Sequence, residues 1–254
     1  MKVSIAIATK GRTNEFIFSL TSYIINADDN SNVEYIIMVD HDDLETIDAL
    51  EKIVNLAHVY GAEIKIFVSD TVYGYEELER YWEKAGEIFT GDCIIPTGDD
   101  NFPITKGWDT RIIEVLAPYL DEPTWIGIVP LNEHWKGYAT MVGINRKWYE
   151  ITGRVTGTRA MDVFIPNVVK RCNVKCVRPD VDFIHLQRGK LDMSYEKDGK
   201  VHLIYGLPSD GRSGFNRNTG ERIPPMYEVH EGVGLERVED TANKLKKWME
   251  QNGK

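Results

Sequence analysis

The sequence contains few cysteines, and their spacing matches no common metal or disulfide pattern. Only three are present, Cys93, Cys172 and Cys176. Cys172 and Cys176 lie four residues apart, but no second pair completes a zinc site. This small, odd set favours reduced thiols, and we expect a cytoplasmic protein.

Long hydrophobic runs are also missing. Residues 1–12 contain two lysines and an apolar run of about six residues. Such a run is too short for the core of a signal peptide and far too short for a membrane span. Other stretches are no better suited, so the sequence predicts no membrane-spanning segment.

Positive charge is scarce. The 254 residues include 30 Lys and Arg against 40 Asp and Glu, which gives a formal net charge of −10. An average surface of this kind does not attract nucleic acid, so a phosphate-containing ligand would need a local source of positive charge. A bound divalent cation is the usual source where carboxylates line a phosphate site.

Glycine is sparse in the loop after the first predicted strand, where Gly11 is the only one in the segment ATKGRT. A G-x-G-x-x-G fingerprint is therefore missing, which argues against a dinucleotide-dependent dehydrogenase. The same loop argues against a sugar-nucleotide nucleotidyltransferase, the nearest enzymatic alternative, which should carry a glycine-rich loop here.

Apolar strands alternate with amphipathic helical patterns over the first hundred residues. The predicted strands are residues 3–8, 33–39, 64–68 and 93–96. Near-continuous apolar strands separated by helices are typical of a parallel sheet covered on both faces. The length suits one α/β domain.

The pattern weakens in the second half but remains readable. It predicts strands near 125–130, 139–144, 174–177 and 181–184, and helices near 112–116 and 162–171. Residues 187–232 show little periodicity, and such long irregular regions are more often functional than structural. Residues 234–251 have apolar side chains at helical spacing, which predicts a docking helix.

Three predicted strands end in unusual polar clusters. The first ends at Thr9–Thr13, the second at Asp40–Asp43 and the fourth at Gly98–Asn101. Ligands of open parallel sheets bind outside the carboxyl ends of the strands. We therefore expect two acidic clusters and one basic cluster to meet in one crevice.

These clusters resemble the nucleotide-sugar-binding half of family 2 glycosyltransferases. Thr9 to Arg12 match the family's Thr-x-x-Arg loop, Asp40 to Asp43 its aspartate-rich turn, and Gly98 to Asn101 its metal-binding DxD motif. The resemblance implies a GT-A fold, a Rossmann-like, mostly parallel sheet between helices. It implies a core over 1–186, with a nucleotide-sugar-binding half (1–101) and an acceptor-side half (102–186), followed by an extension over 187–254.

The DxD position reads Gly-Asp-Asp-Asn, so either Gly98 replaces the first aspartate or the motif is shifted by one residue. Mn²⁺ and Mg²⁺ commonly combine one or two carboxylates with phosphate oxygens, so Asp99 and Asp100 are candidate metal ligands. An aspartate turn that caps the next helix is the alternative.

The resemblance adds His185 as a third candidate ligand, since many GT-A enzymes have a late histidine there. The alternative is a packed or solvent-facing histidine. His134, His202 and His230 are less well placed candidates.

The donor-binding candidates are the polar residues at the same strand ends: Thr9, Lys10, Arg12, Asp40, Asp42 and Asp99. Asp40 could accept from an imide N–H of the base or from ribose hydroxyls, and the basic side chains could contact phosphate. Helix capping by Asp42 or Asp43 and a solvated basic loop are the alternatives.

Asp162 occupies the place where the resembling family has its catalytic acid, at the start of a helix. As a general base it would remove the proton of an acceptor hydroxyl, giving transfer with inversion. The alternative is a helix-start residue favoured by the macrodipole.

The sequence thus predicts a metal-dependent hexosyl- or pentosyltransferase that moves a sugar from a nucleotide-diphosphate donor to an acceptor hydroxyl. The acceptor could be a glycan, a protein or a modified nucleic-acid base. A catalytically inactive nucleotide-sugar-binding module is the alternative from another class. The sequence specifies no oligomeric state.

Overall fold

The computed structural model describes residues 1–75, 77–131, 139, 141–186, 193–197, 200–204 and 233–254. The helices are α1 (Thr13–Asn26), α2 (Leu44–Val59), α3 (Leu78–Ile88), α4 (Trp108–Leu116), α5 (Arg146–Thr152), α6 (Met161–Cys172) and α7 (Val233–Gln251). The strands are β1 (Val3–Thr9), β2 (Val33–Val39), β3 (Glu63–Val68), β4 (Cys93–Gly98), β5 (Asn101–Pro103), β6 (Thr124–Ile128), β7 (Met141–Asn145), β8 (Lys175–Val177), β9 (Phe183–His185), β10 (Met193–Lys197) and β11 (Lys200–Ile204).

The main sheet in this part of the chain has seven strands in the order β3-β2-β1-β4-β7-β6-β8. Neighbouring strands from β3 to β4 are parallel, and β6 is parallel to β8. Strand β7 is antiparallel to both of its neighbours. The predicted mostly parallel α/β sheet is confirmed, with one reversed strand that the sequence pattern did not indicate.

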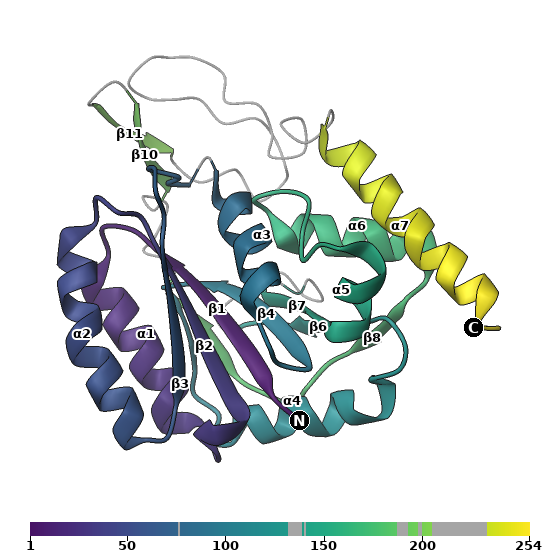
Figure 1. Ribbon diagram of the computed structural model, residues 1–254, viewed down its shortest axis with the longest axis horizontal. Coiled ribbons are helices and arrows are strands. Elements are labelled where there is room, and N and C mark those ends of the chain that lie inside the picture. The colour runs from purple at the N-terminus through teal and green to yellow at the C-terminus, as the bar shows by residue number, and fades with distance from the viewer. Residues whose placement is uncertain (76, 132–138, 140, 187–192, 198–199, 205–232) are drawn as a thin grey trace.

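Helices cover both faces of this sheet, which explains why strands β1 and β2 are buried throughout and mostly apolar. Side chains of β1 alternate between two hydrophobic clusters: Ile5 and Ile7 pack with α1 and α2, whereas Ala6 and Ala8 pack with α3. Figure 1 shows α1 and α2 together on one side of the molecule.

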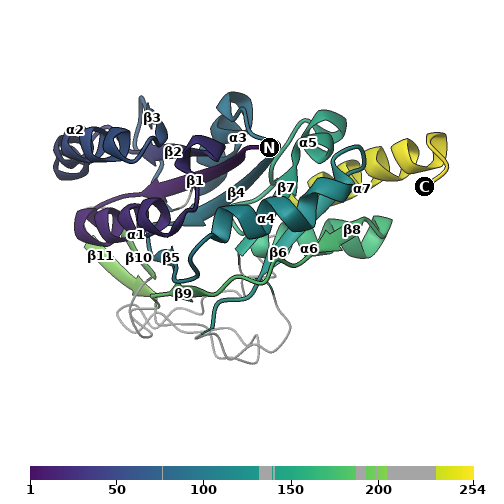
Figure 2. The ribbon, with the colours of Figure 1, turned by 90° about the horizontal axis from the view of Figure 1, so that it is seen from below.

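The predicted docking helix is confirmed as α7. It packs on α5 and α6, and its buried residues Val238, Ala242 and Leu245 join the same hydrophobic cluster as α3 and α6. Figures 1 and 2 place α7 and the C-terminus at the opposite end of the molecule from α2. None of the described helices is long and apolar enough to span a membrane.

Most of the predicted irregular region lies outside the described residues. Within it, β10 and β11 form an antiparallel pair. Just before this region, strand β9 pairs with β5 in a second small antiparallel sheet, with Asn101 opposite His185. This pairing carries a late segment of the chain to the end of β4.

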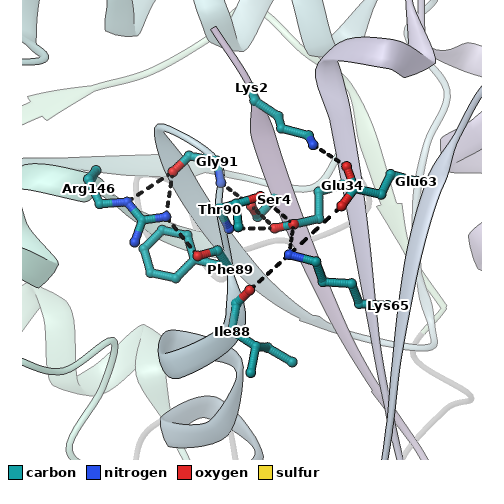
Figure 3. Close-up of polar contacts among 10 residues, drawn as sticks. All are labelled: Lys2, Ser4, Glu34, Glu63, Lys65, Ile88, Phe89, Thr90, Gly91 and Arg146. Atoms are coloured by element: carbon teal, nitrogen blue, oxygen red, sulfur yellow. Dashed lines mark hydrogen bonds and ion pairs between the residues drawn. The ribbon is translucent and has the colours of Figure 1, made fainter.

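A buried polar network ties the amino ends of the strands to α3. Glu34 on β2 is fully buried and accepts hydrogen bonds from Ser4, from Thr90 and from the ammonium of Lys65 (Figure 3). Lys65 also donates to the carbonyl of Ile88 at the end of α3, 3.0 Å away. The network lies at the opposite end of the strands from the polar clusters, so we assign it to the fold.

Candidate active site

Thr9, Arg12 and Asp99 form a buried cluster where β1 and β4 end. Asp99 is fully buried, and Thr9 Oγ1 donates to its Oδ2 at 2.8 Å. Arg12 lies at the start of α1, donates Nε to Asp99 Oδ2 at 3.2 Å and makes an ion pair with Asp99 Oδ1. Burial raises the pKa of Asp99 to about 6, against the opposing charge of Arg12.

Asp100 lies beside His185, and the sequence suggests both residues as metal ligands. Asp100 Oδ2 lies 3.5 Å from His185 Nε2 and 3.3 Å from Arg12 Nη1. The β5–β9 pairing sets this geometry, and Leu186 N donates to the carbonyl of Asp100 at 2.7 Å. Burial would raise the pKa of Asp100, but the hydrogen bond and charge of His185 and the charge of Arg12 outweigh it, so the pKa is lowered.

Gly98 makes room for the carboxylate of Asp100. A Cβ atom at this position would lie 2.7 Å from Asp100 Oδ1, closer than real Cβ contacts come. At present the Asp100 carboxylate lies beside His185. An aspartate at residue 98 would therefore displace it from this position.

The second cluster centres on Asp40, which is fully buried at the end of β2. Lys10 Nζ lies 2.8 Å from Asp40 Oδ2 and 3.1 Å from Asp42 Oδ1. Asp42 is exposed, and Asp43 caps α2 while accepting from Gly11 N at 2.7 Å. The β1 loop is thus tied to both acidic clusters, to Asp40–Asp43 through Lys10 and Gly11 and to Asp99 and Asp100 through Arg12.

The ligand chemistry suits one divalent cation held by few protein groups. A separation of 3.5 Å between Asp100 Oδ2 and His185 Nε2 is compatible with two adjacent ligands of one ion. Mg²⁺ and Mn²⁺ ions that few protein groups hold complete their coordination shell with phosphate oxygens and water. Among the described residues, no three His, Cys, Asp or Glu side chains are arranged so that they could hold a metal ion, so the predicted set of Asp99, Asp100 and His185 does not form one site here. The arrangement fits an ion shared with a phosphate ligand.

Asp162 lies in the first turn of α6 and is half-buried. The loop before α6 contacts the segment after β3, since the guanidinium of Arg159 lies 5.0 Å from the ring centroid of Tyr75. From α7, Arg237 donates to the carbonyl of Gly157 at 2.8 Å and so holds the same loop. The catalytic assignment of Asp162 stays a prediction.

The sequence did not predict two further contacts in the site. Tyr81 on α3 donates to Asp40, and Asn101 Nδ2 donates to Asp100 Oδ1 at 3.2 Å. Tyr81 falls on the apolar stripe of its helix, where the pattern indicates only a core residue. The competitors His134 and His230 lie outside the described residues, and His202 lies on β11.

Comparison with known proteins gives structural but no sequence relatives. No protein-family model matches the chain, and no curated protein sequence does. The solved structure of the mannosyltransferase PcManGT from Pyrobaculum calidifontis, with GDP-Man and Mn²⁺, has a TM-score of 0.61 and 14% identity. The match covers 74% of this chain and 58% of that one.

Two other solved structures are similar over a comparable part of the chain. S. aureus TarS 1–349 has a TM-score of 0.56 at 13% identity and covers 72% of this chain and 59% of its own. GalNAc-T7 with UDP, GalNAc and Mn²⁺ has a TM-score of 0.53 at 12% identity, over 78% of this chain and 45% of its own. This chain thus spans less than two thirds of each. The shared architecture is the GT-A fold, and the chain has it.

Proposed function

We propose that the protein is a metal-dependent glycosyltransferase that uses a nucleotide-diphosphate sugar as donor. The observation that carries the proposal is the meeting of Asp100 and His185 at the carboxyl end of β4 in a GT-A fold. Structural neighbours in complex with GDP-Man or UDP and with Mn²⁺ support this choice of ligands.

The net charge at the carboxyl ends of the strands explains why a cation is needed. The strand ends gather five carboxylates, Asp40, Asp42, Asp43, Asp99 and Asp100, against the two basic side chains Lys10 and Arg12. With His185 neutral this leaves a charge of about −3, which repels a diphosphate. Lys10 and Arg12 are moreover paired with aspartates. A divalent ion on Asp100 and His185 would reverse the local charge.

When bound, the ion would stabilise negative charge on the departing nucleoside diphosphate. Asp99 is proposed to act there as well, by orienting Arg12. Thr9, Lys10, Arg12, Asp40 and Asp42 are proposed to line the donor side, and Arg12 could reach a phosphate oxygen.

Asp162 is proposed as the general base. Its carboxylate would accept the proton of the acceptor hydroxyl while that oxygen forms a bond to the anomeric carbon. The bond from this carbon to the phosphate oxygen breaks, and the nucleoside diphosphate leaves. A single displacement of this kind inverts the anomeric configuration. A hexose or pentose as the transferred sugar, and a glycan, protein or modified nucleic-acid base as acceptor, remain proposals.

Donor hydrolysis by the purified protein tests this function without a known acceptor. Sugar nucleotides carrying uridine or guanosine are incubated with the protein, and release of nucleoside diphosphate is measured with Mn²⁺, with Mg²⁺ and with chelator. We expect release that needs the metal and is lost in Asp100→Ala. Metal-dependent binding without any turnover would support the inactive binding module instead, and neither binding nor turnover would contradict both.

A further inference from the structure

The carboxylate of Asp40 is saturated by the protein itself. Its Oδ1 accepts from the hydroxyl of Tyr81 and from the backbone N–H of Tyr73, and its Oδ2 accepts from the N–H of Gly74 and from Lys10 Nζ. An ionised carboxylate offers about four lone-pair sites, and four donors already converge on this one. A nucleobase could reach Asp40 only by displacing one of them.

These contacts organise residues 69–74, which follow β3 at the carboxyl edge of the sheet. Ser69 N bonds to the carbonyl of Val39, and the amides of Tyr73 and Gly74 both point to Asp40 at 3.0 Å. Gly74 has a φ of +54°, which favours glycine in this turn. Asp40 therefore acts as the internal anchor of the segment.

Tyr81 completes the anchor from α3. Its ring is buried, lies 5.0 Å from the ring of Tyr73, and carries the hydroxyl that donates to Asp40. Next to this segment, Tyr75 is partly exposed, and Arg159 from the Asp162 loop lies over its ring. The anchored segment thus lies between the donor-side strand ends and the acceptor-side loop.

We infer that Asp40 is a positioning residue, which together with Tyr81 holds residues 69–74 and Lys10 in the arrangement that binds the nucleoside of the donor. In this arrangement it makes no direct contact with the base. The inference rests on the proposed function and deepens it, because it assigns nucleoside recognition to the segment that Asp40 holds rather than to its carboxylate.

Tyr81→Phe is the decisive variant, since it removes one hydroxyl of the anchor and leaves Asp40 in place. Binding of UDP, GDP and inorganic diphosphate, each with Mn²⁺, is measured by calorimetry for the wild type, Tyr81→Phe, Asp40→Asn and the double variant. Tyr60→Phe and Asp48→Asn are matched controls, because both positions are exposed and lie on or next to α2.

We expect Tyr81→Phe to weaken binding of the nucleoside diphosphate by about tenfold, the effect of one buried hydrogen bond to a charged group. Inorganic diphosphate should bind with unchanged affinity, since it lacks a nucleoside. The double variant should lose less than the product of the two single losses, because both act through one network. Amide exchange at Tyr73 and Gly74 should accelerate in both single variants, even if Asp40→Asn is too unstable for calorimetry.

Loss of nucleotide binding in Asp40→Asn with wild-type binding in Tyr81→Phe would overturn the inference, since it would indicate direct contact with the base. An equal loss for inorganic diphosphate would overturn it too, by showing general damage to the site. A wild-type protein that binds none of the three ligands would contradict the proposed function itself, and this inference with it.

Discussion

Asp99 and Asp100 are neighbours with different surroundings. Asp99 is enclosed by Thr9 and Arg12, whereas Asp100 shares its Oδ2 between Arg12 and His185. Both contact Arg12, but Asp99 is fully buried, whereas Asp100 lies beside a histidine at the strand end and is therefore better placed to bind a metal. The two residues should therefore respond differently to the same substitution.

We predict that Asp100→Asn weakens Mn²⁺ binding in the presence of nucleoside diphosphate by at least about tenfold, since it removes a ligand charge. Asp99→Asn should have an equal or smaller effect, because the side chain contacts Arg12 directly. Titration of Mn²⁺ followed by electron paramagnetic resonance measures both, with exposed Asp48→Asn as control. A larger effect at Asp99 would place the metal on that carboxylate and shift the register of the motif.

Gly98→Asp would restore an Asp-x-Asp pattern, yet we predict a loss of metal binding. The new Cβ would start 2.7 Å from Asp100 Oδ1, so the Asp100 carboxylate, which now lies beside His185, has to shift. The same Mn²⁺ titration checks this result. Affinity equal to or above that of the wild type would show that the close approach of Asp100 to Gly98 is not needed.

Asp162→Asn tests mechanism rather than binding. The amide keeps the shape of the side chain but accepts no proton, so turnover should fall about 10²–10⁴-fold while donor affinity barely changes. Rates with an identified acceptor, and the anomeric configuration of the product by NMR, check this prediction. Retention of configuration or near-normal turnover would reduce Asp162 to a residue that starts α6.

At the scale of elements, the network around Glu34 joins β1, β2, β3 and the end of α3. Burial opposes ionisation of Glu34, but hydrogen bonds from Lys65, Ser4 and Thr90 outweigh it, so the pKa of its carboxyl is lowered. Because the unfolded chain then takes up the proton first, the contribution to stability is complete above about pH 4.5 and is lost as pH falls through the lowered folded pKa.

We predict that Glu34→Gln lowers the free energy of unfolding at pH 7 by about 1.5–3 kcal/mol, the range for hydrogen bonds to a charged group. The difference from the wild type should shrink as the pH falls below about 4.5. Urea denaturation at several pH values measures it. Glu63→Gln, at a half-exposed position beside the same lysine, should change stability by less than about 0.5 kcal/mol. A loss independent of pH would show that the charge of Glu34 is not involved.

The whole molecule should respond to its donor by becoming more stable. A ligand at 100 times its dissociation constant stabilises the folded state by about 2.7 kcal/mol, which raises the melting temperature of a protein of this size by about 5–10 °C. We predict such a shift for one class of sugar nucleotide, only with Mn²⁺ or Mg²⁺ and not in Asp100→Ala. A thermal-shift screen measures it. A shift without metal would contradict the assigned metal site.

The sequence alone determined the alternation of strands and helices, the docking helix and the three polar strand ends. These follow from local periodicity and from the rule that parallel strands end at one edge, so residues near one another in the chain were enough. Asp99 and Asp100 were placed correctly at the end of β4 for this reason.

Only the tertiary structure decided which side chains meet. The β5–β9 pairing brings His185 to Asp100, and the packing of α3 brings Tyr81 to Asp40 across 41 residues of sequence. Both contacts join segments that are far apart in the sequence. The periodicity of one segment does not indicate which other segment it will contact. The space left by Gly98 is likewise visible only once Asp100 has its orientation. The local sequence pattern indicates which face of a helix or strand is apolar. Packing between distant segments sets the distances between side chains on which binding and catalysis depend.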